Sequence, residues 1–118
     1  MITLYGIPNC GTVKKARAWL DAQGVAYRFH DFKKLGVPAA DLTRWAAAVG
    51  WERLLNRQGT TWRRLDAAEQ ARAGTQEGAL ALMQAQPSVI KRPVVDWGQG
   101  RITFGFDETM FTDGLQSS

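Results

Sequence analysis

The first third of the chain alternates between a strand pattern and a helix pattern. Residues 1–5 place Ile2 and Leu4 alternately with polar neighbours, which predicts a strand. Residues 25–32 alternate again and predict a second strand. Because a connection that contains a helix returns the chain in its original direction, the two strands are expected to pair in parallel. The intervening helix is indicated by apolar residues at helical spacing before a glycine: Val13, Ala16, Trp19, Leu20 and Gly24.

The middle of the chain has helical spacing. After an expected loop at residues 33–37, Pro38 suits a first helical turn, and apolar residues follow at helical intervals up to Gly50. The next segment, residues 51–64, predicts a short helical turn followed by a loop. Two further short helices are predicted at residues 66–73 and 77–85, the second ended by Pro87.

The last part of the chain returns to strand patterns. Two apolar segments flank Gly98-Gln99-Gly100, which is typical of a hairpin, and Asp107 suits the cap of a final helix with Met110 and Phe111 buried. The tail, residues 116–118, is expected to fray. The order is therefore β-α-β, a helical insertion over about residues 38–86, and β-β-α. This order predicts an α/β fold of the thioredoxin type, as a single domain over residues 1–118.

Composition narrows the classes of function. The 118 residues are 45% hydrophobic and 22% charged, as in a soluble globular domain, and apolar runs fall short of the ~20 residues of a membrane span. The start of the chain does not have the layout of a secretory signal. The net charge of +4 is modest, and the densest aromatic-basic cluster, Trp62-Arg63-Arg64, is interpreted as a solvated face. No specific nucleic-acid or membrane partner is therefore expected.

The candidate chemistry centres on Cys10, the sole cysteine, which falls between the first strand and the first helix. The first helical turn has free N–H groups and partial positive charge, and both stabilise a thiolate. Cysteines at such positions have pKa values of roughly 3.5–7.5, compared with ~8.5 for an ordinary thiol. Thr12 and Lys14 are candidates to add a hydroxyl donor and a cation. The alternative interpretation is a small buried apolar residue.

One cysteine also limits what else the chain can do. It permits no internal disulfide, so a cytoplasmic location is expected. His30, the sole histidine, is the only candidate for a Cys-His dyad, and no feature beyond its uniqueness supports one. One cysteine and one histidine do not complete a zinc site, so no metal is expected.

Three separated segments carry a family resemblance: Tyr-Gly-Ile-Pro-Asn-Cys-Gly-Thr at residues 5–12, Leu-Leu-Asn-Arg-Gln-Gly-Thr-Thr-Trp-Arg at residues 54–63, and Ile-Lys-Arg-Pro-Val-Val at residues 90–95. Together they resemble the ArsC/Spx family of thioredoxin-fold proteins, and most closely its YffB-like branch. The resemblance implies that Cys10 is a redox nucleophile, that Arg92 lies near it, and that Pro93 is a cis-proline facing the site.

Departures from the family pattern separate the possible activities. Arsenate reductases of this family use three arginines, one each in the central segment, before the proline and in the hairpin. Here Arg92 occupies the position before the proline. In the central segment, the arginine position aligns either with Arg57 or with Asn56 beside it. The hairpin position is occupied by Phe104. Arsenate reduction is therefore an alternative function. Spx-type regulators dock on RNA polymerase and commonly carry a second cysteine three residues after the first, where this chain has Val13. A docking module without an internal disulfide switch is the other alternative.

The leading hypothesis is a glutathione-dependent thiol reductase with one nucleophilic cysteine. A lone cysteine needs an external thiol, and glutathione, whose carboxylates suit a basic pocket, is the expected co-substrate rather than a bound cofactor. The second substrate is expected to be a small-molecule or protein disulfide, with a glutaredoxin as a further possible partner, and the sequence does not identify it. The predicted binding residues around Cys10 are Asn9, Gly11, Thr12, Lys14, Arg57, Arg92 and Pro93.

Overall fold

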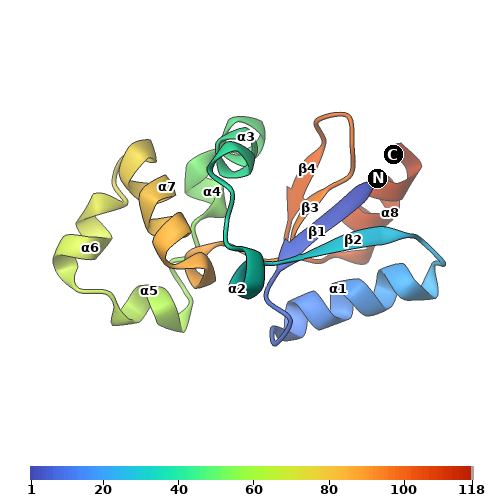
Figure 1. Ribbon diagram of the computed structural model, residues 1–118, viewed down its shortest axis with the longest axis horizontal. Helices are drawn as coiled ribbons and strands as arrows, with labels where there is room; N and C mark the ends of the chain where they lie inside the picture. Colours follow the sequence, from blue (N-terminus) through green and yellow to red (C-terminus); the bar gives the residue numbers. More distant parts are fainter. Residues whose placement is uncertain (118) are drawn as a thin grey trace. The chain divides into compact units, whose positions relative to one another are not determined.

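The computed structural model describes residues 1–117, with no account of the Ser117 side chain. The chain forms two compact units (Figure 1). Unit 1 combines Met1–Leu35 with the described part of Arg92–Ser118, and unit 2 is Gly36–Lys91. The single domain expected from the sequence thus contains two units, and the expected insertion at residues 38–86 lies within unit 2.

Unit 1 is built on a four-stranded mixed sheet. Its strands, in the spatial order β2-β1-β3-β4, are β1 (Ile2–Gly6), β2 (Tyr27–Asp31), β3 (Val94–Asp96) and β4 (Ile102–Phe104). β1 pairs in parallel with β2, whereas β3 pairs antiparallel with both β1 and β4. The predicted β-α-β unit and the predicted hairpin are therefore both present.

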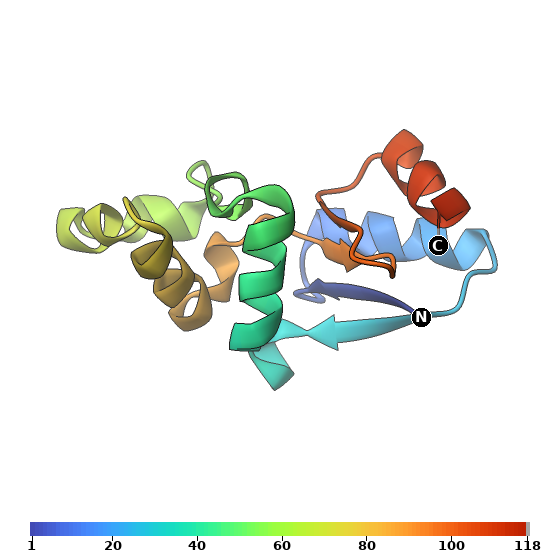
Figure 2. The same cartoon turned by 90° about the horizontal axis from the view of Figure 1, so that it is seen from above.

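Two helices of unit 1, α1 (Gly11–Ala22) and α8 (Glu108–Ser117), cover one face of the sheet (Figure 2). The Phe111 ring lies edge-on to Trp19 of α1 and Trp97 after β3, with ring centroids 5.7 and 5.0 Å apart respectively. Asp107 caps α8 as predicted, because its Oδ1 accepts from the Met110 N–H at 2.9 Å. The predicted fraying is wrong for residues 116 and 117, which continue α8, and residue 118 lies outside the described residues. The core between sheet and helices contains Ile2, Leu4, Val13, Ala16, Leu20, Val95, Trp97 and Phe111.

The loop expected at residues 33–37 is partly wrong, because a one-turn helix, α2 (Phe32–Leu35), follows β2 directly. Asp31 Oδ1 accepts from the Lys33 N–H at 2.8 Å, a local bond that favours a turn over a continued strand. Phe32 is buried, and its ring centroid lies 6.3 Å from that of Tyr5 in β1. β2 accordingly ends one residue earlier than predicted.

Unit 2 is helical. It contains α3 (Ala39–Val49), α4 (Trp51–Leu54), α5 (Thr60–Arg64), α6 (Ala67–Arg72), α7 (Gln76–Ala85) and the 3₁₀ turn η1 (Pro87–Val89). The loop expected after residue 54 is wrong for α5, whose turn is closed by the Arg63 N–H donating to the Gly59 carbonyl. Pro38 precedes α3 as its N-cap rather than lying in its first turn. The buried core of the unit includes Leu42, Trp45, Ala46, Leu54, Leu55, Ala73, Ala79, Met83, Val89 and Ile90.

A short antiparallel pairing joins two distant segments of unit 2. Leu55 bridges to Ile90, the Asn56 N–H donates to the Val89 carbonyl at 2.7 Å, and the Lys91 N–H donates to the Leu54 carbonyl at 2.8 Å. The sequence did not predict this pairing. It ties the end of α4 to the segment after η1. Among the described helices, none combines the length and apolar character that a membrane crossing requires.

Candidate functional site

Cys10 lies at the N-terminus of α1, where the sequence predicted it. After β1 ends at Gly6, the chain turns, and the Cys10 N–H donates to the Ile7 carbonyl at 3.2 Å. Cys10 is the N-cap residue, with extended backbone angles, and its carbonyl accepts from the Lys14 N–H at 2.9 Å. A side chain at Gly6 would approach Val13 to 2.8 Å, so the glycine lets the start of α1 pass close to the end of β1.

The surroundings of the Cys10 thiol favour its ionised form. Burial of the half-buried thiol raises its pKa, but this effect is outweighed. The Val13 N–H donates to the sulfur, the Arg92 side chain donates a hydrogen bond and adds its positive charge, and the Thr12 N–H also donates. The net result is a Cys10 pKa below that of an ordinary thiol. The thiolate fraction near neutral pH rises accordingly.

Arg92 reaches Cys10 because the sheet pairs β1, which precedes Cys10, with β3, which follows Arg92. Val94 of β3 pairs with Tyr5 of β1, which places the residues before β3 beside the end of β1 that leads into Cys10. The Arg92–Pro93 peptide bond is cis, as the resemblance implied, and the Pro93 carbonyl accepts from the Gly105 N–H at 2.9 Å. Arg92 is half-buried and Pro93 is buried.

The other predicted residues near Cys10 are exposed: Asn9, Gly11, Thr12 and Lys14. A Cβ added to Gly11 would meet no atom within 4 Å, so the chain beside the thiol is open. Among the described residues, the contacts that lower the thiol pKa involve the Thr12 backbone rather than its hydroxyl, and they do not include the Lys14 ammonium. The sequence predicted N–H groups of the first helical turn as donors, and the structure identifies those of Val13 and Thr12.

The structure places Arg57 in unit 2, so its predicted role beside Cys10 stays a prediction. Its side chain is exposed, and the guanidinium carbon lies 5.6 Å from the centre of a Trp62 ring. Phe104, the hairpin position that lacks an arginine, is half-buried in β4 and pairs with Val94. Its ring has no hydrogen-bond donor to offer an oxyanion.

His30 lies among aromatic rings on β2. Its ring centroid is 5.0 Å from that of Tyr5 and 5.9 Å from that of Phe32. These contacts favour a packing role over the Cys-His dyad considered from the sequence. Across the part of the chain that the structure describes, no group of three or more His, Cys, Asp or Glu side chains could hold a metal ion.

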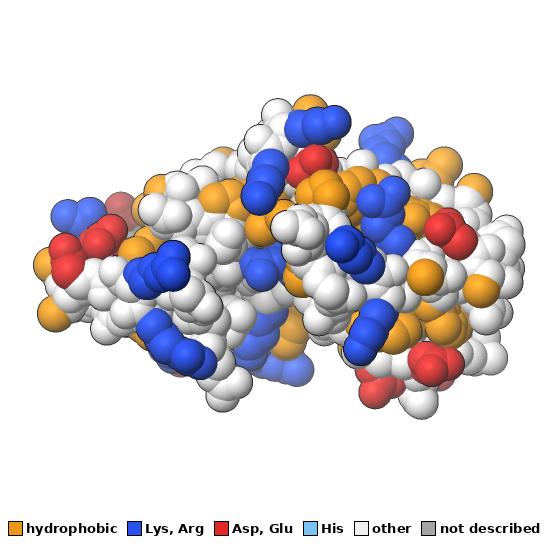
Figure 3. All heavy atoms as spheres, turned by 90° about the horizontal axis from the view of Figure 1, so that it is seen from below, with side chains coloured by type: hydrophobic (Ala, Val, Ile, Leu, Met, Phe, Trp, Pro, Cys, Tyr) orange, Lys and Arg blue, Asp and Glu red, His pale blue; other side chains and the backbone are white. Residues whose placement is uncertain are grey.

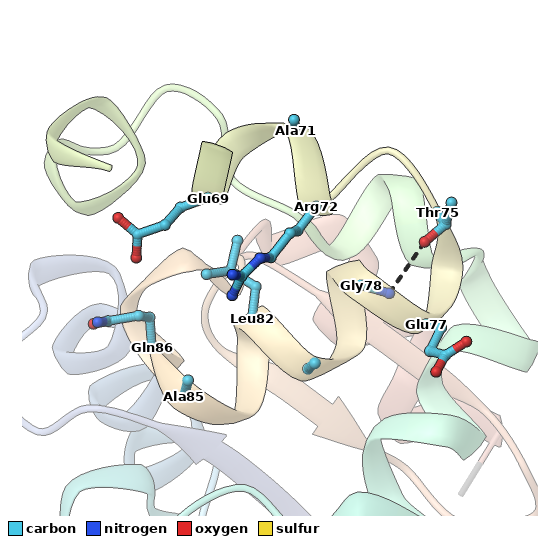
Figure 4. Close-up of a pocket in the computed structure, with 10 residues that line it drawn as sticks. Glu69, Ala71, Arg72, Thr75, Glu77, Gly78, Leu82, Ala85 and Gln86 are labelled. Carbon is cyan, nitrogen blue, oxygen red and sulfur yellow. Dashed lines mark hydrogen bonds between the residues drawn. The ribbon is translucent and has the colours of Figure 1, made fainter. Parts of the chain in front are cut away.

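On the face drawn in Figure 3, Lys and Arg side chains are dispersed, with Asp and Glu side chains among them. A hollow of about 510 Å³ between α6 and α7 is lined by small residues, among them three alanines, and by the charged side chains of Glu69, Arg72 and Glu77. Figure 4 shows Arg72 reaching from α6 toward α7, with the Thr75–Gly78 hydrogen bond at one end. This hollow contains none of the residues that the sequence assigned to the site.

Comparison with known proteins places the chain in a family. The model of the ArsC family matches residues 5–113. The chain belongs to the ArsC family. A solved protein named YFFB has 48% identical residues and a TM-score of 0.92, with 98% of this chain and 99% of that one covered. An arsenate reductase (ArsC) related protein from Brucella melitensis has 43% identity and a TM-score of 0.74, with coverage of 98% and 94%.

A curated relative of another kind is the global transcriptional regulator Spx from Streptococcus agalactiae. It is 28% identical over 112 residues, which are 92% of this chain and 78% of the regulator. One of these relatives is thus named as related to arsenate reductase and another as a transcriptional regulator. The thioredoxin-like fold and the family expected from the sequence are both confirmed.

Proposed function

We propose that this protein is a glutathione-dependent thiol reductase in which Cys10 is the nucleophile. The observation that carries the proposal is the thiol at the N-cap of α1, with a pKa lowered by the Val13 N–H and by Arg92. Thiol-disulfide exchange requires both a thiolate and access to it. The lowered pKa of Cys10 supports the first requirement, and the exposed Gly11 beside the half-buried cysteine supports the second.

The proposed reaction consists of two exchanges. In the first, the Cys10 thiolate attacks the glutathione sulfur of a mixed disulfide, a new S–S bond forms at Cys10, and the substrate leaves as a thiolate that takes a proton from water. In the second, the thiolate of a free glutathione attacks the glutathione sulfur bound to Cys10 and releases glutathione disulfide and the Cys10 thiolate. One substrate disulfide is reduced and one glutathione disulfide is formed, so electrons balance.

Arg92 has two roles in this proposal. Its charge and hydrogen bond stabilise the Cys10 thiolate before attack and again when Cys10 is the leaving group. It also offers a cation to the carboxylates of glutathione. The backbone beside Pro93 is the expected pairing partner of the glutathione backbone, by the resemblance to glutaredoxin-like folds.

The test combines alkylation with coupled turnover. Iodoacetamide labelling of Cys10 against pH is expected to give a pKa below ~8.5. Cys10→Ser is expected to abolish glutathione-coupled disulfide reduction, and Thr12→Ser, with the same backbone donor, is expected to retain it. Full activity of Cys10→Ser, or an ordinary thiol pKa, would sink the proposal.

Arsenate reduction is the second candidate, favoured by the contact between Cys10 and Arg92 and by the likeness to the Brucella protein. Phe104 weighs against it, because one charged hydrogen bond contributes about 1.5–3 kcal/mol to anion binding. We expect Cys10-region amide shifts in NMR titrations with glutathione and none with arsenate. Tight arsenate binding with glutathione-dependent arsenite release would promote this candidate.

The likeness to Spx favours a third candidate, a docking module that binds a transcription partner and uses Cys10 as a site of glutathionylation. A pull-down from bacterial lysate with wild type and Cys10→Ser distinguishes it from the reductase. A stoichiometric polymerase subunit together with absent turnover would support docking. Turnover without any stoichiometric partner would support the reductase.

A further inference from the structure

A hollow of about 380 Å³ in unit 1 adjoins the turn that leads to Cys10. Its size is within the range of small-molecule sites. We call it the Arg17 hollow. Its lining comes from that turn, α1, β2 and α2, and consists of Pro8, Arg17, Phe29, Asp31, Lys34 and Leu35.

Arg17 is held in position by two contacts. Its Nε donates to the Tyr27 hydroxyl at 3.1 Å, and its guanidinium carbon lies 4.0 Å from the centre of the Phe29 ring. The bond to Tyr27 uses Nε, so it does not occupy the two terminal guanidinium nitrogens, which can donate to a carboxylate. A cation that is already oriented loses less entropy when it binds an anion.

The charges around the Arg17 hollow are unequal. Two cations, Arg17 and Lys34, face one anion, Asp31, and within the described residues neither cation is ion-paired to it. One oxygen of Asp31 already accepts from the Lys33 N–H. The hollow is therefore electropositive. Its apolar wall includes Leu35, which is 66% exposed.

The Arg17 hollow is close to the thiol along the chain. Pro8 precedes Cys10 by two residues, so their Cα atoms lie within about 7 Å even if the segment were extended. The segment is in fact turned, because the Cys10 N–H bonds to the Ile7 carbonyl. The turn therefore places Pro8, in one wall of the hollow, next to the residue that carries the thiol.

We propose that the Arg17 hollow is a specificity subsite that binds a carboxylate on a short apolar stem, carried by the half of the disulfide substrate that departs. The proposal rests on the proposed reductase function and names its substrate class. The carboxylate would bind Arg17 and Lys34, while the stem packs on Phe29 and Leu35. The chemistry is unchanged: Cys10 forms a bond to one sulfur, and the carboxylate-bearing sulfur leaves as a thiolate.

Two kinds of substrate could supply such a carboxylate: a small acidic thiol, or a protein cysteine with an acidic side chain beside it. The first experiment uses three symmetrical small disulfides as probes: dithiodipropionate, hydroxyethyl disulfide and cystamine. Each reacts with reduced protein, and mass spectrometry gives the rate constant for mixed-disulfide formation at Cys10. The chain has one cysteine, so each adduct is assigned without ambiguity.

The readout is the ratio of rate constants for the anionic and the neutral probe. Arg17→Gln and Lys34→Gln are each expected to lower this ratio about three- to fivefold, as for a charged contact at a partly exposed site. The matched controls are Lys33→Gln on α2 and Arg28→Gln on β2, which remove an equal charge outside the hollow. They are expected to leave the ratio near its wild-type value.

The possible outcomes distinguish a failure of the proposed subsite from a failure of the proposed reductase function. If the neutral probe fails to react with Cys10, the reductase function fails. If it reacts but Lys34→Gln and Arg17→Gln keep the wild-type ratio, or the controls lower it equally, the subsite is overturned. A second arm uses peptide disulfides with Asp or Asn beside the cysteine. An Arg17-dependent preference for the Asp peptide would support a protein source, and a preference limited to dithiodipropionate would support a small acidic thiol.

Discussion

The sheet of unit 1 is assembled from segments far apart in the sequence, whereas unit 2 is built mainly of helices, with a distant bridge between Leu55 and Ile90. In unit 1, Tyr5 pairs with Val94, and the same sheet brings Arg92 to Cys10. In unit 2, the starts of α6 and α7 are fixed by side chains that bond to N–H groups three residues on. The reactive contact occurs in the unit built from distant segments. Its geometry therefore depends on the sheet, whereas the helix starts of unit 2 depend mainly on their own residues.

The largest expected effect tests the long-range packing of unit 1. Phe111 is fully buried and its ring contacts Trp97 and Phe106 at centroid distances of 5.0 and 4.9 Å. Phe111→Ala is expected to lower the free energy of unfolding by about 3–5 kcal/mol, through lost burial and a cavity. Urea denaturation measures the change, and Phe111→Leu should cost less. A loss below about 1 kcal/mol would contradict this account of the core.

The next largest effect tests the close packing of unit 2. A Cβ on Gly78 would overlap the carbonyl oxygen of Arg72, a backbone atom that cannot move aside by rotation. Gly78→Ala is expected to destabilise the protein by about 1–3 kcal/mol, as overpacking does. Gly11→Ala is the control, since a Cβ there meets no atom within 4 Å. Equal midpoints of unfolding for wild type and Gly78→Ala would show that the α6–α7 junction is looser than described.

A smaller effect tests the local caps. Asp66 accepts from the Glu69 N–H at 2.8 Å, and the Glu69 side chain accepts from the Asp66 N–H at 3.3 Å. Asp66→Ala is expected to cost about 1 kcal/mol and to increase amide exchange within α6. Asp66→Asn keeps an acceptor and should behave nearly as wild type. If Asp66→Ala instead increased amide exchange in β1 and not in α6, the cap would not act locally, which would contradict the distinction between local and long-range stabilisation.

The contact between Cys10 and Arg92 predicts a change in reactivity. Arg92→Gln removes the charge and weakens the hydrogen bond, so the Cys10 pKa should rise. At neutral pH the alkylation rate should fall by about threefold or more, a modest factor because the thiol is only half-buried. Arg92→Lys keeps the charge and should show a smaller fall. An unchanged pH profile of alkylation in Arg92→Gln would remove Arg92 from the site.

The smallest expected effect is a pH dependence of stability. The Cys10 pKa is lower in the folded chain than the ~8.5 of an unfolded one, so between those two values the unfolded chain binds more protons. The thiolate's contribution is complete above ~8.5 and is lost as pH falls through the folded pKa. The free energy of unfolding of wild type minus that of Cys10→Ser should therefore rise with pH across this window. A difference that falls would reverse the assigned pKa direction.

Local sequence patterns predicted most elements because each depends on neighbouring residues. The apolar spacing of Val13, Ala16 and Leu20 defines the buried side of α1, and these residues are buried. Prediction was weakest for short elements: α2 and α5 each contain a single turn, too little for a periodic signal. The pairing of Leu55 with Ile90 also escaped, because an isolated bridge leaves no alternating pattern.

The sequence by itself predicted the candidate nucleophile and determined its place, since a lone cysteine between a strand and a helix lies near the helix start. The family resemblance added Arg92 and Pro93. Only the tertiary structure brings Arg92, 82 positions away in the numbering, to the sulfur, whereas the Val13 and Thr12 N–H groups belong to the first turn of α1, whose free donors the sequence predicted. It also decided that Arg17, Asp31 and Lys34 share one hollow. Strand pairing and helix packing bring these residues together, and neither is encoded by any short stretch of sequence.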